Sequence, residues 1–311
     1  MKIIIAAGTG FLGNVLLEHF QNPLNDIIVL TRGKTMLKNN IRYIHWNAKT
    51  MTGWEKELEN ADVLINLAGK SVDCRYTEAN KKEILLSRIK STKILNKAVL
   101  QCTHPPKHWL NSSTATIYRH SLDQQMDEYT GEIGNDFSMN VAQSWEKAFF
   151  KTETPKTLKT ALRTSIVLGK KGGAFLPLKN LTKMGFGGKQ GNGNQFVSWI
   201  HEEDFARAVE FIIQNEIIGK INIVSPEPIR NTDFMKAIRK AMKIPFGAPI
   251  GKRMLEFGAK IIGTETELVL KSRNVIPKRL LEIGFTFHYP NLNNVFQNLV
   301  QNDNSATDDQ N

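Results

Sequence analysis

Short apolar runs alternate with segments of helical periodicity along the first hundred residues. The apolar runs, rich in β-branched residues, predict four strands, at 3–6, 27–30, 41–46 and 63–67. Apolar residues at spacings of three and four predict helices over 15–21 and about 78–100, and Pro23 ends the first of them. Strands without polar alternation that are separated by helices indicate a parallel sheet covered on both faces.

The alternation continues to about residue 224 and is interrupted by a glycine-rich stretch. In chain order, it predicts a strand from 107 to the small residues 112–115, a helix over 137–151, strands over 160–167 and 197–200, a helix over 205–214 and a strand over 220–224. Eight glycines from residue 169 to 194 indicate loops or a flexible lobe and not regular core. From residue 225 onward the pattern is mostly helical.

These elements predict a doubly wound α/β fold with a smaller, mostly helical second lobe. We expect the sheet domain to span 1–165 and to take up about 195–224, with the lobe formed by 166–194 and 225–300. Residues 301–311 are polar apart from one alanine, so we expect a frayed tail there. A substrate is expected at the carboxyl ends of the strands, between the two parts.

Composition narrows the class of protein. Forty-one Lys and Arg against 30 Asp and Glu give a net charge of +11, yet no block of like charges reaches five residues. We therefore expect no nucleic-acid partner, and a basic surface that is either simply solvated or attracts small anionic molecules. Two cysteines fit a reducing compartment, and no apolar run suits a signal peptide or a membrane span. We expect a soluble, cytoplasmic protein without a membrane partner.

A glycine motif follows the first predicted strand and opens the first predicted helix. Glycines permit a tight turn and let backbone N–H groups approach a pyrophosphate, and the helix N-terminus adds partial positive charge. The position between strand and helix favours a dinucleotide site over the alternative, an ordinary tight turn. We expect six residues to bind the dinucleotide: Gly8, Thr9, Gly10, Phe11, Leu12 and Gly13.

The end of the second strand indicates which dinucleotide is bound. NAD sites usually have Asp or Glu there, about 20 residues after the glycines. Here Thr31 and Arg32 follow the strand. Asp26 lies at the start of the strand, which is the end away from the expected ribose site. A planar guanidinium pairs well with a 2′-phosphate, so we expect Thr31 and Arg32 to contact NADP(H), which should bind better than NAD(H). A solvated surface role for Arg32 is the alternative.

The combination of motifs resembles the short-chain dehydrogenase/reductase superfamily, in its extended, nucleotide-sugar-epimerase-like branch. The likeness is greatest to a group of NADP-binding epimerase family proteins with a small C-terminal domain of uncharacterised role. Its marks are the segments 7–13, 29–32, 66–69, 87–89, 162–164, 172–174, 198–201 with Asp204, and 277–281. The group usually has glycine where Ala7 stands, and alanine is small enough to keep the turn.

The resemblance implies further cofactor contacts. Leu67, Ala68 and Gly69 would form the loop that passes beside the cofactor, where small residues permit close approach. A plain strand stop is the alternative for that loop. The resemblance also places Ser112 near the cofactor, and Arg163 could bind a phosphate of cofactor or substrate or form a structural ion pair.

The resemblance implies a catalytic hydroxyl but departs from the superfamily in its acid–base pair. Thr114 falls on the position of the hydroxyl that polarises the substrate oxygen, and an alternative register gives that role to Ser113. A simple strand-end cap is the bland interpretation of both. The superfamily's Tyr and Lys are replaced by Ser138 and Ala142, and Tyr118 is a candidate substitute as proton donor.

Other polar residues carry weaker signals. Arg88 is as consistent with a structural ion pair as with a phosphate contact, and His201 could titrate near neutrality. Asp204 is expected to cap the helix that begins near residue 205. The seven histidines are scattered and no metal-ligand spacing occurs, so no metal site is expected.

Two functions of different classes follow. One is an NADP(H)-dependent oxidoreductase or epimerase for a small hydroxyl or carbonyl substrate, with a nucleotide sugar as one candidate. The other is a catalytically silent NADP(H)-binding sensor or scaffold. The absent Tyr–Lys pair favours the second, and the retained substrate lobe favours the first.

Overall fold

A computed structural model describes residues 1–262 and 265–301, so the predicted tail lies almost entirely outside the described residues. Its main sheet has eight strands in the order β11-β7-β6-β5-β1-β2-β4-β3. All neighbours in this sheet pair in parallel except β3, which is antiparallel to β4. The strands are β1 (Lys2–Ala6), β2 (Asp26–Thr31), β3 (Met36–Lys38), β4 (Ile41–His45), β5 (Val63–Asn66), β6 (His108–Thr114), β7 (Leu158–Thr164) and β11 (Gly219–Ile223). The doubly wound α/β prediction is confirmed.

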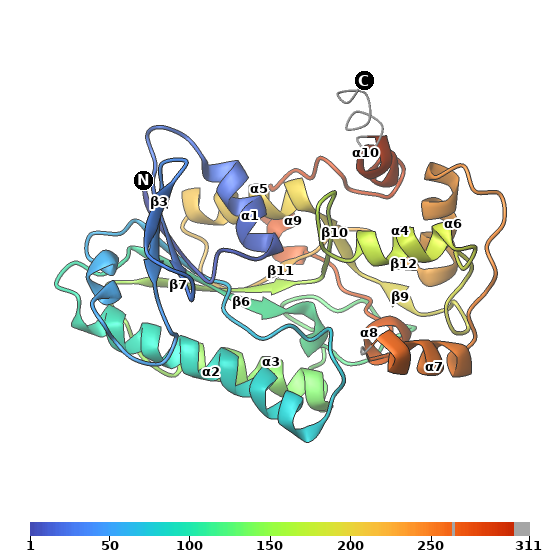
Figure 1. The fold of residues 1–311 in the computed structure, drawn as a ribbon, viewed down its shortest axis with the longest axis horizontal. Helices are drawn as coiled ribbons and strands as arrows, with labels where there is room; N and C mark the ends of the chain where they lie inside the picture. Colours follow the sequence, from blue (N-terminus) through green and yellow to red (C-terminus); the bar gives the residue numbers. More distant parts are fainter. Residues whose placement is uncertain (263–264, 302–311) are drawn as a thin grey trace.

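Helices cover both faces of this sheet (Figure 1). On one face lie α1 (Phe11–Phe20) and α5 (Glu202–Gln214), and on the other α2 (Glu78–Gln101) and α3 (Phe137–Phe150). Alternate residues of β1 therefore join different cores: Ile3 and Ile5 pack under α1, while Ile4 packs toward α2. Burial on both faces explains why these strands are apolar without alternation.

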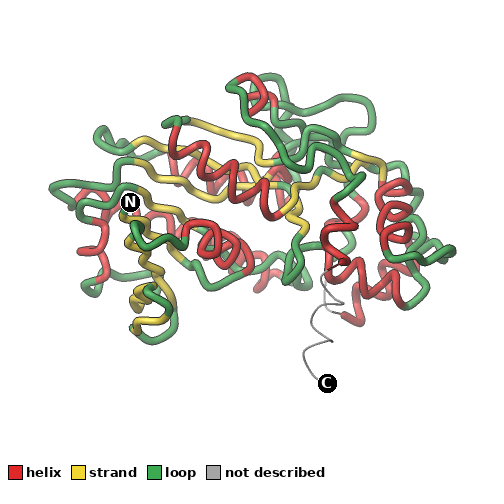
Figure 2. The backbone as a smooth tube through the Cα atoms, turned by 90° about the horizontal axis from the view of Figure 1, so that it is seen from above, coloured by secondary structure: helices red, strands yellow, loops and turns green. Residues whose placement is uncertain are grey.

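A smaller lobe lies at the far end of the sheet from the N-terminus (Figure 2). Its short strands are β8 (Ile166–Leu168), β9 (Phe196–Val197), β10 (Trp199–His201) and β12 (Ile229–Arg230), and its helices are α4 (Phe175–Lys183), α6 (Asn231–Ala241), α7 (Lys252–Ile262), α8 (Glu267–Leu270) and α10 (Val295–Gln301). Phe175, Trp199, Phe234 and Phe296 fill its core. The remaining helix, α9 (Lys278–Glu282), packs on β11, so Leu280 joins the core of the main sheet.

The glycine-rich stretch is more regular than its composition indicates. It contains α4, and the glycines that precede this helix pack against the ring of Phe11. A Cβ would lie 2.5 Å from Phe11 Cζ at Gly169 and 2.4 Å from Phe11 Cδ2 at Gly172, while Gly173 has φ +69°. These glycines therefore permit a close approach between the lobe and the start of α1.

Several boundaries differ from the predictions. The strand predicted over 160–167 is two strands, β7 and β8, and the strand predicted over 197–200 is divided between β9 and β10. The capping role predicted for Asp204 is wrong, because α5 begins at Glu202 and is capped by His201. The buried Asp204 carboxylate instead accepts hydrogen bonds from the backbone N–H groups of His288 and Tyr289, at 2.9 and 2.7 Å.

Candidate functional site

The glycine motif forms a tight turn between β1 and α1, at the point where the strand order reverses between β1 and β5. A Cβ at Gly13 would lie 2.2 Å from the backbone oxygen of Gly8, and one at Gly8 would lie 2.8 Å from Ile5 Cγ2. A Cβ at Gly10 would meet no atom within 4 Å. Two glycines thus let strand and helix pack closely, and the third leaves open space at the helix N-terminus. This is the geometry that a pyrophosphate requires.

Two details of the turn bear on its fit to a dinucleotide. The first turn of α1 contains no acidic residue, so no carboxylate competes with an anion at the helix N-terminus. Ala7 adopts φ +59°, in the left-handed region that glycine prefers, and its N–H donates to Leu30 O at 2.8 Å. Alanine therefore occupies a backbone conformation for which the related group has glycine, and the turn is retained.

Thr31 and Arg32 lie at the same edge of the sheet as the glycine motif, because β1 and β2 pair in parallel with Ala6 opposite Leu30. Thr31 is buried, and its hydroxyl accepts a hydrogen bond from Gly33 N at 3.1 Å. Arg32 is exposed, and its guanidinium has no hydrogen bond or ion pair with any described residue. An unpaired arginine at this edge fits the predicted role of binding a 2′-phosphate.

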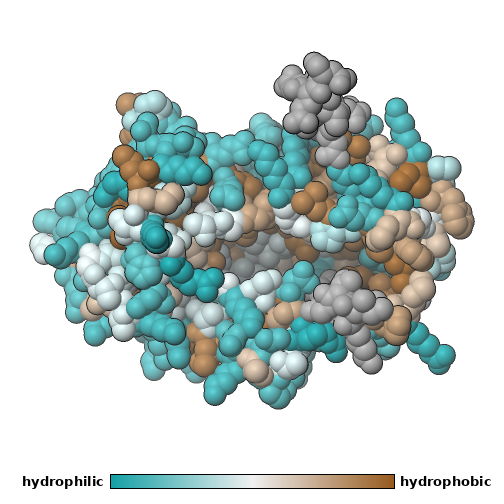
Figure 3. Space-filling model, viewed as in Figure 1, coloured by the Kyte–Doolittle hydropathy of each residue, from teal (hydrophilic) through white to brown (hydrophobic). Residues whose placement is uncertain are grey.

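A cleft of about 340 Å³ lies at the carboxyl ends of β5, β6 and β7. Five of the predicted site residues line it: Leu12, Leu67, Gly69, Ser112 and Thr114. They come from α1, from the loop after β5 and from β6, so the fold brings together residues about one hundred positions apart. The space-filling view shows a hollow between the main sheet and the lobe (Figure 3).

Thr114 and Ser113 differ in what their hydroxyl groups do. The Ser113 hydroxyl is buried and donates to Glu146 Oε1 at 2.7 Å. The Thr114 hydroxyl accepts a hydrogen bond from Thr116 N at 3.1 Å, and its own hydrogen is committed to no described acceptor. Thr114 can therefore donate to an oxygen atom in the cleft, whereas Ser113 is already engaged by a carboxylate.

Tyr118 and Arg163 do not line the cleft. The Tyr118 hydroxyl is buried, accepts from Arg163 Nη1 at 2.8 Å and donates to Asn222 Oδ1 at 2.9 Å. Arg163 in turn forms two 2.8 Å bonds to the carboxylate of Glu146. Of the two roles left open for Arg163, the structure therefore shows the ion pair with Glu146. Burial also raises the pKa of Tyr118, so neither its position nor its titration suits a proton donor to the cleft.

The positions of the missing acid–base pair are also defined. Ser138 lines the cleft, and Ala142 is fully buried in a cluster with Tyr118. His201 stacks on Tyr289 with the ring centres 3.8 Å apart and is almost completely buried, so it contributes to the lobe and not to the cleft. Alanine at position 142 cannot take the part of the superfamily's lysine.

Sequence reasoning missed part of the cleft wall. Tyr76, Trp145 and Lys70 line it, together with Arg88, for which the sequence left two roles open. Within residues 1–262 and 265–301, no group of three or more potential metal ligands occurs, and no helix is long and apolar enough to cross a membrane. The wall combines hydroxyl, aromatic and cationic side chains with aliphatic ones such as Leu12 and Leu67.

Known proteins are similar to this chain in both fold and sequence. Residues 3–138 match the NAD dependent epimerase/dehydratase family, and residues 255–299 match a domain of unknown function (DUF1731). A solved human epimerase family protein, SDR39U1, whose crystal structure is with NADPH, has a TM-score of 0.85 at 26% identity over 97% of this chain and 100% of its own.

Relatives from two bacteria cover almost the whole chain. Epimerase family protein SAR0825 of Staphylococcus aureus is 31% identical over 302 residues, which are 96% of this chain and 99% of the relative. Epimerase family protein YfhF of Bacillus subtilis is 32% identical over 305 residues, which are 96% of this chain and 98% of the relative. Identity of this level over nearly the full length of both chains shows that this protein belongs to the epimerase family.

Proposed function

We propose that this protein is an NADP(H)-dependent oxidoreductase or epimerase that acts on a hydroxyl or carbonyl group of a small molecule. The observation that carries the proposal is the open space at Gly10, at the N-terminus of α1, with the unpaired Arg32 at the same sheet edge. The NADPH in the structure of the human relative supports the choice of cofactor. A hydroxyl group on the cleft wall, that of Thr114, supports chemistry on a substrate oxygen.

The cofactor would supply the hydride, and the chain's own residues would hold the substrate. The backbone of residues 8–13 would bind the pyrophosphate, and Arg32 the 2′-phosphate. Thr114 would donate a hydrogen bond to the substrate oxygen, where negative charge develops when a carbonyl is reduced. Leu12 and Leu67 would exclude water from one side of the cleft. Ser138 is a second hydroxyl on the same wall.

One observation favours a second function, binding of NADP(H) without turnover as a sensor or scaffold. Ala142 fills the position of the superfamily's lysine, and Ser138 that of its tyrosine, so the usual proton donor is absent. A serine hydroxyl with an ordinary pKa is a poor acid–base group at neutral pH. The two functions differ in whether the protein oxidises NADPH in the presence of a substrate.

Replacement of Arg32 by alanine tests the cofactor. We expect the Kd for NADPH to rise by about tenfold or more, because a charge-assisted pair with the 2′-phosphate is lost, while the Kd for NADH stays unchanged. Calorimetric titration measures both constants. Arg119→Ala removes another partly exposed arginine, one that pairs with Glu132, and should alter neither constant. Equal loss of affinity for NADPH and NADH in Arg32→Ala would remove Arg32 from this role.

Replacement of Thr114 by valine tests the chemistry. Purified protein is screened for NADPH oxidation against carbonyl compounds and nucleotide sugars. With a substrate found, Thr114→Val should lower kcat by about a hundredfold, as removal of one donor to a developing oxyanion does, and Thr114→Ser should retain most of the rate. NADPH affinity should be the same in all three proteins. No oxidation of NADPH with any substrate, with NADPH binding intact, would favour the sensor function instead.

A further inference from the structure

Arg88 is a partly buried cation in the wall of the cleft, and no carboxylate of the described residues pairs with it. It lies on α2, with its guanidinium carbon 5.0 Å from the centre of the Trp145 ring. Its Nη1 donates to the backbone oxygens of Lys70 and Ile84, at 3.0 and 2.9 Å. No ion pair joins it to any described residue, whereas the neighbouring Lys70 is paired with Glu83. The chain thus neutralises the outer cation and leaves the inner one charged.

The free donors of Arg88 have the form of an oxyanion receptor. A guanidinium carries five N–H donors, and both hydrogens of Nη1 are used by backbone oxygens. Nε and Nη2 have no described acceptor, and together they form the edge that binds a carboxylate or phosphate through two parallel bonds. Burial lowers the pKa of Arg88 to about 10, so it remains charged at neutral pH although burial without a counterion is costly.

Gly69 is required for this arrangement. A Cβ at Gly69 would lie 3.1 Å from the guanidinium carbon of Arg88 and 3.3 Å from Nη1 and Nη2. The glycine therefore lets the loop after β5 pass directly over the guanidinium. The ring of Trp145 also holds the planar group by cation–π contact. Backbone, glycine and indole fix the orientation of Arg88 without removing its charge.

A second arginine, Arg273, whose side chain is 15% exposed, lies in the segment after α8. Its Nη1 is buried without a hydrogen-bond partner among the described residues, while its Nη2 forms a long ion pair with Glu267 Oε1 at 4.0 Å. The hydroxyl of Tyr76 is buried beside the side chain of Ser138, and it lies within electrostatic range of both guanidinium groups. Tyr76 therefore has a cation on its cleft side, Arg88, and a second cation, Arg273, in its surroundings.

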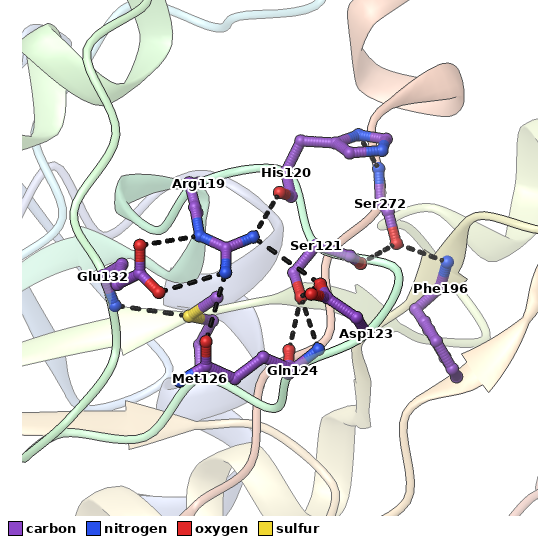
Figure 4. Close-up of polar contacts among 9 residues, drawn as sticks. All are labelled: Arg119, His120, Ser121, Asp123, Gln124, Met126, Glu132, Phe196 and Ser272. Atoms are coloured by element: carbon purple, nitrogen blue, oxygen red, sulfur yellow. Dashed lines mark hydrogen bonds and ion pairs between the residues drawn. The ribbon is translucent and has the colours of Figure 1, made fainter.

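Ser272, the residue before Arg273, is anchored by several hydrogen bonds (Figure 4). The Ser272 N–H donates to His120 Nδ1 at 3.0 Å, and the Ser272 hydroxyl accepts from Phe196 N at 2.8 Å and donates to Ser121 O. The Arg273 N–H also donates to Phe196 O at 2.8 Å. This stretch of the C-terminal segment is thus anchored to β9 and to the loop after Tyr118, so the second cation is also preorganised.

We propose that Arg88 and Tyr76, with Arg273 as a nearby second cation that does not itself line the cleft, form an oxyanion pocket in the cleft wall, which binds a carboxylate or phosphate group of the substrate. The proposal rests on the proposed function, since it assigns the substrate class of the same cleft. The recognised chemistry is a planar or tetrahedral oxyanion beside the reacting hydroxyl or carbonyl. Its two sources are a small organic acid and the diphosphate of a nucleotide sugar.

The test is calorimetric titration of the full-length protein, saturated with NADPH, with oxalate and separately with UDP. We expect at least one of them to bind, with oxalate indicating a small acid and UDP a nucleotide sugar. Arg88→Gln should weaken that binding by about tenfold or more, because a charged bidentate contact is replaced by a neutral one. The matched variant Arg119→Gln changes an arginine that is already paired with Glu132 and should bind as the unaltered protein does.

Stability separates this role from a structural one. Arg88→Gln removes a partly buried charge that lacks a counterion, so its melting temperature without added anion should equal or exceed that of the unaltered protein. A structural arginine predicts a clear fall instead. Tyr76→Phe is a second variant with the same shape, and it should weaken anion binding while leaving the Kd for NADPH unchanged.

The outcomes distinguish the two proposals. Absence of binding by both oxalate and UDP at millimolar concentration, with NADPH bound, overturns the oxyanion pocket and leaves the cofactor site untouched. Binding of either anion with equal affinity to Arg88→Gln and the unaltered protein overturns it as well. Failure to bind NADPH overturns the proposed function, and titration without cofactor then tests the pocket by the same Arg88→Gln comparison.

Discussion

Replacement of Glu146 by glutamine is expected to destabilise the protein by about 3 kcal/mol or more, the cost of breaking a buried ion pair by removal of one charge. Glu146 binds Arg163 through two 2.8 Å hydrogen bonds and accepts a third from Ser113 at 2.7 Å. The Arg163 and Glu146 side chains are only 4% and 7% exposed. Glutamine has nearly the same shape, so the loss would come from an uncompensated guanidinium and not from a cavity.

Urea denaturation measures this effect, with Glu132→Gln as the control. Glu132 forms the comparable pair with Arg119, but the two side chains are 54% and 31% exposed, so less than about 1 kcal/mol is expected. A double variant, Glu146→Met with Arg163→Met, should recover much of the stability, because apolar residues of similar size often replace a buried pair at little cost. Equal midpoints for Glu146→Gln and Glu132→Gln would contradict the interpretation.

The network around Glu146 explains why the sequence indicated Tyr118 as a candidate proton donor although its hydroxyl is engaged elsewhere. Tyr118 lies in the loop after β6, the other members are on β6, α3, β7 and β11, and Tyr118 and Asn222 are 104 positions apart. A tyrosine near a strand end has the same local pattern whether its hydroxyl points into a cleft or into a buried network. Only the pairing of β7 with β11, which is a long-range contact, places Asn222 where it takes up this hydroxyl.

Elements buried on both faces were the predictable part of the fold. β1 and β2 are almost continuously apolar because the sheet is covered on both faces, and the sequence pattern of a strand reflects its burial. The sequence did not predict β3, because all three of its residues are exposed at the sheet edge. An exposed edge strand needs no apolar pattern. The function of Gly169 and Gly172 was also hidden, since it depends on Phe11, far away in the chain.

The part of the candidate site that would bind the cofactor through backbone groups was predictable from the sequence. The turn at residues 8–13 needs glycine for reasons of space alone, so its spacing shows in the sequence. The cleft wall uses side chains from α2, α3 and the loop after β5, whose meeting depends on tertiary packing. Arg88 therefore remained ambiguous until its contacts with Gly69 and Trp145 were known.

Substitution of Gly10 by alanine should leave the fold intact and weaken NADPH binding by about thirtyfold or more, equivalent to about 2 kcal/mol. Gly10 has φ −87° and ψ −177°, which alanine adopts without strain, and its Cβ would meet no protein atom within 4 Å. The added methyl group would enter the space that a pyrophosphate needs at the helix N-terminus. Calorimetric titration with NADPH and thermal melting of the cofactor-free protein measure the two effects separately.

Gly13→Ala is the matched variant, because the same methyl group there meets the protein itself. Its Cβ would lie 2.2 Å from the Gly8 backbone oxygen and 2.4 Å from the Gly8 carbonyl carbon, so strand and helix must separate. We expect destabilisation of about 2 kcal/mol or more from this overpacking, and NADPH binding is lost with the shape of the turn. If Gly10→Ala bound NADPH with unchanged affinity, the turn would not hold the pyrophosphate. Gly10 caps α1 and faces open space, whereas Gly13 lies inside α1 against Gly8, so the pair of variants separates cofactor contact from fold.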